Sequence, residues 1–247
     1  MDKMKFGSLF AGIGGIDLGL ERAGMECAWQ VEIDPFCQKV LAKHWPEVAR
    51  YEDIREVGSH NLGPVDLICG GFPCQDISYA GKGSGLSGER SGLWREMLRT
   101  IRMVRPRLAL VENVAALLRR GMGRVLGDMA ESGYDAEWDC LPAAAFGARH
   151  FRERVFIIAT SGVLANTPII NQGDMGRLPP SVERWRRLGE PNSETGWLWP
   201  NESGVGRRAY GVPRGVDRLR CLGNAVVPQV AEWMWRRLID STGGGDD

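Results

Sequence analysis

The 247-residue sequence lacks the features that mark several common classes of protein. No run of 18 apolar residues occurs, so we expect no membrane-spanning helix. The first ten residues contain no apolar signal-peptide core, so we expect a protein of the cytoplasm. The six cysteines contain no CxxC pair and the three histidines do not cluster, which argues against a disulfide framework and against a bound metal such as zinc.

Net charge is also absent, because 31 basic residues balance 31 acidic ones. This balance neither favours nor excludes a nucleic-acid partner, but the charges are unevenly distributed. Nine arginines and six acidic residues lie between residues 174 and 220. Arginine presents a planar fork that suits phosphate groups and guanine edges. A solvated face with no polyanionic partner explains this pattern equally well.

A glycine-rich turn near the N-terminus predicts a nucleoside-binding site. An apolar strand over residues 5–10 leads into three glycines and then into a helix over 16–23. This order presents backbone N–H groups and a helix N-terminus to a polar ligand. Glu32 ends the next predicted strand, over 28–31, where a carboxylate accepts hydrogen bonds from both hydroxyls of a ribose. Leu18 occupies the place of the third glycine of a dinucleotide-binding turn, so S-adenosylmethionine is favoured over a dinucleotide.

Two aspartates follow predicted elements of this first half of the chain. Asp34 is a candidate cap for a helix that begins at Pro35 and extends to about His44. Asp53 follows a weak strand over 48–52, where a carboxylate is placed to accept a hydrogen bond from an adenine amino group. A turn or cap role for Asp53 is an equally good interpretation.

Cys74 lies where a buried strand meets a loop rich in glycine and serine. Residues 65–69 form the predicted strand, two glycines follow it, and Pro73 fixes φ immediately before the thiol. The loop, over 79–90, suits a lid. A thiol held at the carboxyl end of a strand in an open α/β sheet is presented as a nucleophile. A structural role is the commoner explanation for an isolated cysteine, so the neighbouring motifs decide between the two.

The rest of the chain continues the alternation of strands and helices that characterises an α/β fold. The periodicity predicts helices over 91–103, 115–132 and 229–240, the second interrupted by Gly121 and Gly123, and strands over 107–111, 134–140 and 154–159. Glu112 ends the first of these strands, and in a parallel sheet it shares an edge with Cys74. A carboxylate at that position is either functional or a helix cap. Residues from 160 to about 214 show little periodicity, which indicates a small irregular insert.

Four side chains of this sequence can together modify a cytosine. The thiolate of Cys74 can add to C6 of the base, while the carboxylic acid of Glu112 shares its proton with N3. The adduct makes C5 nucleophilic toward the methyl sulfonium of S-adenosylmethionine, and no metal is needed. Arg152 and Arg154 can hold O2 of the base and favour the thiolate by their charge.

The order of these motifs resembles that of the DNA (cytosine-5)-methyltransferase family over nearly all of the chain outside the insert. The blocks that carry the resemblance are FxGxGG over residues 10–15, Glu32, Asp53-Ile54, GFPCQ over 71–75, ENV over 112–114, RxR over 152–154 and GNAVVP over 223–228. Each block alone is weak evidence, but GFPCQ, ENV and RxR in this order are specific. The sequence departs from the family at Arg149-His150, where Pro-Gln is usual, and in the shortness of its insert.

The resemblance implies a fold and a division into domains. The expected fold is α/β, a Rossmann-like S-adenosylmethionine-dependent methyltransferase sheet with helices on both faces and a small irregular target-recognition insert. Residues 1–160 and 215–247 are expected to form the catalytic domain. Residues 161–214 are expected to form a short target-recognition region.

The same motif positions imply roles for individual residues. The resemblance makes Cys74 the nucleophile and Glu112 the proton donor to N3, and Arg152 and Arg154 position the base. The residues implied for the methyl-donor pocket are Phe10, Gly12, Ile13, Gly15, Glu32, Ile33, Asp53, Ile54, Gly71, Pro73, Asn224 and Val226. The expected DNA contacts are a serine near the nucleophile and six arginines of the insert: Ser78, Arg177, Arg184, Arg186, Arg187, Arg207 and Arg208. Surface charge, or pairing within the insert, explains each of these arginines equally well.

The implied activity is methyl transfer from S-adenosylmethionine to C5 of a cytosine in double-stranded DNA, with the base flipped out of the duplex. The loop over 79–90 is expected to close over the DNA. We expect a monomer, and a cognate restriction endonuclease is the protein partner that such an enzyme can have. Two alternatives are a tRNA cytosine-5 methyltransferase on the same scaffold and a catalytically silent DNA-binding module. The GFPCQ block is of the DNA type and no catalytic residue is missing, which favours the DNA enzyme.

Overall fold

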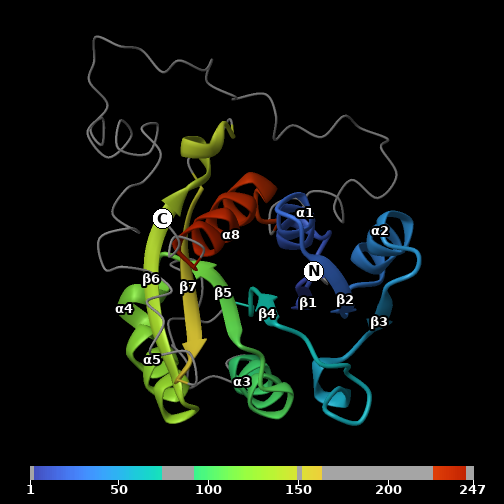
Figure 1. The fold of residues 1–247 in the computed structure, drawn as a ribbon, viewed down its shortest axis with the longest axis horizontal. Helices are drawn as coiled ribbons and strands as arrows, with labels where there is room; N and C mark the ends of the chain where they lie inside the picture. Colours follow the sequence, from blue (N-terminus) through green and yellow to red (C-terminus); the bar gives the residue numbers. More distant parts are fainter. Residues whose placement is uncertain (1–2, 74–91, 149–151, 163–224, 243–247) are drawn as a thin grey trace, which may run out of the picture.

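A seven-stranded sheet organises the part of the chain that the structure describes (Figure 1). The computed structural model describes residues 3–73, 92–148, 152–162 and 225–242. The strands are β1 (Lys5–Leu9), β2 (Glu26–Val31), β3 (Ala49–Tyr51), β4 (Leu67–Gly70), β5 (Leu108–Val114), β6 (Tyr134–Pro142) and β7 (Glu153–Ser161). The helices are α1 (Gly15–Arg22), α2 (Pro35–His44), α3 (Gly92–Val104), α4 (Leu117–Arg120), α5 (Met122–Glu131) and α8 (Pro228–Thr242), with short 3₁₀ turns at Ile54–Glu56 and Ala143–Phe146.

The strand order places the carboxyl ends of several strands at one edge of the sheet. The order is β3-β2-β1-β4-β5-β7-β6. The strands from β3 to β5 are parallel, whereas β7 is antiparallel to both of its neighbours, β5 and β6. The order in which successive strands are added to the sheet reverses at β1: β2 pairs with one side of β1, and β4 pairs with the other side. Open α/β sheets bind ligands outside the carboxyl ends of their strands at such a switch point.

Helices cover both faces of the sheet, which confirms the predicted architecture. On one face α1, α2 and α8 bury apolar side chains such as Leu20, Leu41 and Met234 in a common core. On the other face α3 and α5 do the same with Met97 and Met129. Figure 1 shows α8 beside α1, although the two helices lie near opposite ends of the chain. In the described ranges no helix is both long enough and apolar enough to cross a bilayer.

One predicted element differs in length from the observed one, and one predicted interruption is confirmed. The strand predicted over 107–111 continues to Val114 in β5, because β7 pairs with it residue by residue as far as Val114 opposite Arg154. The helix predicted over 115–132 is interrupted at Gly121, as predicted, which separates α4 from α5, whereas Gly123 lies within α5. The Glu112 side chain therefore projects from within a paired strand rather than from a loose end.

The close packing of α8 on α1 depends on a glycine. A Cβ atom at Gly19 would collide with the carbonyl oxygen of Pro228 and lie 2.8 Å from Cβ of Ala231. The end of the described chain therefore packs directly on its beginning. The loop predicted over 79–90 lies outside the described residues, as does the recognition region predicted over 161–214 apart from its first two residues.

Candidate active site

A cavity of about 280 Å³ opens at the carboxyl edge of the sheet. Its walls come from the ends of β1, β4 and β5, from the residues that follow β2, and from the residues that precede α8. Eight of the twelve residues predicted for the methyl-donor pocket line it: Phe10, Gly12, Gly15, Glu32, Ile33, Gly71, Pro73 and Val226. Glu112, Arg152 and Arg154 line the same cavity, so the fold brings three predicted catalytic residues beside most of the predicted donor pocket.

Three residues predicted for the donor pocket, Ile13, Asp53 and Ile54, are not among those that line the cavity. Asp53 caps the 3₁₀ turn, accepting a hydrogen bond from the backbone N–H of Arg55 at 2.9 Å. Its carboxylate also pairs with the Arg55 guanidinium, which lowers the pKa of Asp53. Ile54 is buried in the core under α3. The structure thus shows the cap role of Asp53, and its contact with an adenine stays a prediction.

Several predicted site residues lie outside the described residues. They are Cys74, Ser78, Asn224 and the six predicted DNA-contact arginines: Arg177, Arg184, Arg186, Arg187, Arg207 and Arg208. The unusual Arg149-His150 pair is also outside. Their roles remain predictions.

Glu112 and Arg154 form an ion pair across two antiparallel strands. Nε of Arg154 lies 2.9 Å from Oε1 of Glu112, and the two side chains are 21% and 10% exposed. The register explains the contact, because Arg154 pairs with Val114 and residues two apart on a strand share one face. The preceding strand also approaches closely: a Cβ atom at Gly71 would lie 2.5 Å from Oε2 of Glu112. A glycine at position 71 therefore allows the end of β4 to meet this carboxyl group.

The Glu112 carboxyl group is tuned to hold a proton near neutral pH. Burial raises the pKa of Glu112 from 4.5 to about 7, although the charges of Arg154 and Arg152 and the hydrogen bond from Arg154 lower it. Both protonation states are therefore populated at neutral pH. A group that gives and takes a proton during a reaction needs this property.

The residues that lead into Cys74 are fixed against β5 and α3. The amide of Asn113 donates a hydrogen bond to the carbonyl oxygen of Phe72 at 3.1 Å. Phe72 is buried, and the centroid of its ring lies 5.2 Å from that of Trp94 in α3. Pro73 lines the cavity. Phe72, two residues before Cys74, is thus held by contacts on both sides, and Pro73 follows it at the cavity.

Glu32 braces the glycine turn at the start of α1. Its Oε2 accepts from the N–H of Gly12 and its Oε1 from the N–H of Asp34, each at 2.7 Å. Burial raises the pKa of Glu32, and these hydrogen bonds lower it. Each carboxylate oxygen has two lone pairs, so both can accept another hydrogen bond from a ligand. Asp34 also caps α2, as the sequence predicts, by accepting from the N–H groups of Phe36 and Cys37.

Sequence reasoning misses a buried polar network beneath the glycine turn. Asp17 in α1 is fully buried and accepts hydrogen bonds from Oγ of Ser8 at 2.9 Å and Nε2 of Gln30 at 2.8 Å. Burial raises the pKa of Asp17 to about 6, while both hydrogen bonds lower it. The signal that the sequence offers for this network is a polar residue on the buried face of a helix, together with two polar residues in otherwise apolar strands. The network joins β1, β2 and α1 just where they form the cavity.

The sheet, its switch point and the cavity define the class of Rossmann-like methyltransferases. The fold is similar to that of a prophage-encoded E. coli protein described as a DNA modification methyltransferase, with a TM-score of 0.55 and 27% identity over 66% of this chain and 48% of that one. It is also similar to the S. pombe Dnmt2 methyltransferase, with a TM-score of 0.53 and 18% identity over 65% of this chain and 50% of that one. The second likeness shows the fold alone.

The chain belongs to the C-5 cytosine-specific DNA methylase family, whose model matches residues 4–187. It is 38% identical to the type II methyltransferase M2.BsuMI of Bacillus subtilis (strain 168) over 165 residues, which cover 64% of this chain and 42% of that protein. It is 34% identical to the type II methyltransferase M.NgoFVII of Neisseria gonorrhoeae over 163 residues, which cover 64% of this chain and 44% of that protein. The matched region thus spans about two-fifths of the length of these relatives.

Proposed function

We propose that this protein transfers a methyl group from S-adenosylmethionine to C5 of a cytosine in double-stranded DNA. S-adenosylmethionine is the methyl donor of the family. The observation that carries the proposal is the Glu112–Arg154 pair. It places a carboxyl group whose pKa is about 7 at a cavity that Pro73, the neighbour of Cys74, also lines.

The cavity offers groups that suit both parts of the donor. Glu32 has free lone pairs for sugar hydroxyls, and the apolar side chain of Ile33, 63% exposed, offers a surface for a flat base. Phe10 lines the same space. Backbone forms another wall, since a Cβ atom at Gly15 would collide with the carbonyl oxygen of Val226. When bound there, S-adenosylmethionine supplies an electrophilic methyl group.

The side chains of this protein prepare the cytosine for that methyl group. The Cys74 thiolate adds to C6, and Glu112 gives a proton to N3, so negative charge does not accumulate on the ring. C5 thereby becomes nucleophilic and would take the methyl group of the bound donor, whose sulfur would be left as a thioether. A base then takes the C5 proton and Glu112 takes back the N3 proton, so the sulfur–carbon bond breaks, the thiolate leaves and the base is restored. Arg154 holds Glu112 in place, and Arg152 lies beside it to orient the base.

The DNA has to present its base to this cavity unpaired. C6 and N3 are not accessible while a cytosine is stacked and paired, so we propose that the base is flipped out of the duplex. The packing of α8 on α1 supports a catalytic domain formed by residues 1–160 and 215–247. Residues 161–214, with their arginines, would then select the target sequence.

The proposal also covers the setting in which the enzyme works. Modification of chromosomal DNA requires a protein of the cytoplasm, and the buried thiols of Cys27 and Cys69, which form no disulfide, suit a reducing compartment. We propose that the protein acts as a monomer. A restriction endonuclease with the same target is the partner that the type II relatives suggest.

A Cys74→Ser variant tests the mechanism. Wild-type protein should move a labelled methyl group from S-adenosylmethionine to duplex DNA and not to tRNA. Cys74→Ser should reduce this transfer by about 10³-fold or more while S-adenosylmethionine still binds. Cys140→Ser, which changes a thiol on β6, should remain active.

A duplex containing 5-fluorocytosine provides an independent readout. Fluorine at C5 blocks the last proton loss, so the wild-type protein should become covalently attached to the DNA and the Cys74→Ser variant should not. Bisulfite sequencing of DNA from expressing cells would identify the methylated bases. Normal methyl transfer by Cys74→Ser would overturn the mechanism, and transfer to tRNA alone would overturn the choice of substrate.

A further inference from the structure

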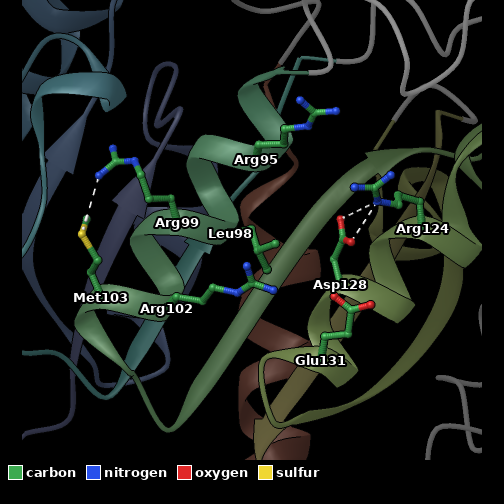
Figure 2. Close-up of a pocket in the computed structure, with 8 residues that line it drawn as sticks. All are labelled: Arg95, Leu98, Arg99, Arg102, Met103, Arg124, Asp128 and Glu131. Atoms are coloured by element: carbon green, nitrogen blue, oxygen red, sulfur yellow. Dashed lines mark hydrogen bonds and ion pairs between the residues drawn. The ribbon is translucent and has the colours of Figure 1, made fainter.

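A groove between α3 and α5 is separate from the cavity described above. It has a volume of about 380 Å³ and is lined by Arg95, Leu98, Arg99, Arg102, Met103, Arg124, Asp128 and Glu131. Four of these eight residues are arginines, and they come from two different helices (Figure 2). The groove is therefore a basic surface built by tertiary packing.

The chain around the groove is unusually rich in arginine. Residues 92–131 contain eight arginines, no lysine and four acidic residues, although the whole protein has no net charge. One of the acids is Glu112, which belongs to the other site. Arginine is the side chain that binds phosphate groups through a planar, two-pronged set of donors. The composition therefore suits a partner that carries phosphate groups.

Some of the groove arginines have structural roles and others do not. Arg99 pairs with Glu96 and donates to backbone carbonyl groups, which secures α3 to the segment before β4. Arg124 donates to Asp128 through Nε alone, so its terminal nitrogens have no partner among the described residues. Arg95 is exposed and makes no hydrogen bond or ion pair within the described ranges. Arg95 and Arg124 are therefore available to a ligand.

The topology places these two available arginines at the same edge of the sheet as Glu112. The helix α3 connects the parallel strands β4 and β5, so it begins at their carboxyl edge. Arg95 is in its first turn, and Arg124 is in the first turn of α5, which follows β5. Figure 2 shows Arg95 and Arg124 toward one end of the groove, with Arg102 and Glu131 toward the other. The exposed guanidinium group of Arg95 and the terminal nitrogens of Arg124, whose Nε is paired with Asp128, thus lie at the end of the groove nearest the candidate active site.

We propose that this end of the groove binds the phosphate backbone of duplex DNA beside the methylated cytosine, with Arg95 and Arg124 as the phosphate contacts. The inference rests on the proposed function, because a flipped cytosine at Glu112 brings its duplex to this edge. Such contacts set the register of the protein on DNA and carry no sequence information. They would add to whatever base contacts the residues of the insert make.

The salt dependence of DNA binding tests this inference. The slope of log affinity against log salt concentration falls by about 0.9 for each phosphate contact that is lost. Arg95→Gln and Arg124→Gln, made in the full chain, should each reduce the slope by about this amount for a duplex of arbitrary sequence. Arg107→Gln removes the same charge from an exposed side chain just before β5, at the opposite edge, and should leave the slope unchanged. Affinity for S-adenosylmethionine should be the same in all four proteins.

The outcomes separate this inference from the proposed function. If Arg95→Gln and Arg107→Gln show the same slope, or if the wild-type chain binds no duplex, the groove does not contact DNA. If the wild type methylates DNA while the Arg95→Gln slope matches the wild type, the groove assignment fails and the proposed function stands. If the slope depends on Arg95 but no methyl group is transferred, the groove assignment stands and the proposed function fails.

Discussion

Glu112 shows how burial and charge compete at a single residue. Removal from water favours the neutral carboxyl group, and the guanidinium of Arg154 at 2.9 Å favours the charged one. Burial is the larger influence, so the pKa settles at about 7 instead of near 4.5. Both protonation states are then populated at neutral pH, which the proposed proton transfer to N3 of cytosine requires.

Substitution of Glu112 should remove this proton and the pH dependence that accompanies it. Glu112→Gln keeps the shape of the side chain but cannot deliver a proton, so we expect methyl transfer to fall by about 10²–10⁴-fold with unchanged S-adenosylmethionine affinity. In the wild type, kcat/KM should decline as the pH rises through about 7, because Glu112 then loses its proton. Steady-state methyl transfer at a series of pH values measures both effects. Glu137→Gln, on β6 and outside the cavity, is the control, and equal loss in both variants would contradict the role of Glu112.

Asp17 is a second buried carboxyl group, and its effect is on stability. Its pKa rises from 3.8 in the unfolded chain to about 6 in the folded one, so the folded state binds the proton more tightly. The contribution of the protonated Asp17 to the free energy of unfolding is fully present below pH 3.8 and is lost as the pH rises through about 6. The shift of about two pKa units corresponds to about 3 kcal/mol.

Replacement of Asp17 by asparagine should flatten this part of the pH–stability curve. An asparagine amide can accept from Gln30 and donate to the Ser8 hydroxyl, so the network remains satisfied without a buried charge. Urea unfolding of Asp17→Asn should therefore show no loss of stability between pH 4 and pH 6 from this site. Asp135→Asn, at an exposed position on β6, should follow the wild-type curve. A wild-type slope in Asp17→Asn would show that another group titrates.

Among the elements, the contact of α1 with α8 is the most sensitive to added volume. A Cβ atom at Gly19 would meet the Pro228 carbonyl oxygen, and it would lie 3.0 Å from the backbone nitrogen of Glu232. These are backbone atoms, so they can yield only if the whole helix moves. Overpacking of this kind costs about 1–3 kcal/mol.

A pair of glycine-to-alanine variants tests the contact of the two helices. Gly19→Ala should lower the free energy of unfolding by about 1–3 kcal/mol, because α8 must shift. Gly127→Ala, in α5, would meet nothing within 4 Å and should raise stability by about 0.5–1 kcal/mol, because alanine favours a helix more than glycine does. Urea unfolding at fixed pH measures both. A stabilised Gly19→Ala variant would show that α8 packs less closely than described.

At the scale of the whole molecule, local patterns predict the elements better than their relations. Apolar runs and helical spacing identify β4, β5 and α3. Parallel pairing of β4 with β5 then puts Glu112 at the edge of the sheet where β4 ends, shortly before Cys74 in the sequence. The direction of β7 has no local signal, because its apolar residues suit either orientation. Only its pairing with both β5 and β6 makes it antiparallel, and that register carries Arg154 to Glu112.

Side-chain partners are the part of the site that the sequence specifies least. Asp53 has the same position after a strand whether it faces a ligand or pairs with Arg55, and only the folded chain shows the pairing. Asp17 looks like an ordinary helix residue until β1 and β2 enclose it with Ser8 and Gln30. The Asp53–Arg55 contact is local, whereas the contacts of Asp17 join residues whose proximity depends on the completed fold.

The ring contact between Phe72 and Trp94 has a consequence for how this protein can diversify. Because the two rings are in contact, the described chain on the two sides of residues 74–91 meets at nearly one point. The entropy of closing a loop between such fixed ends changes by only about 0.6 kcal/mol when its length doubles. Evolution could therefore lengthen, shorten or rewrite the stretch between Pro73 and Gly92, while the scaffold beneath keeps almost all of its folding stability.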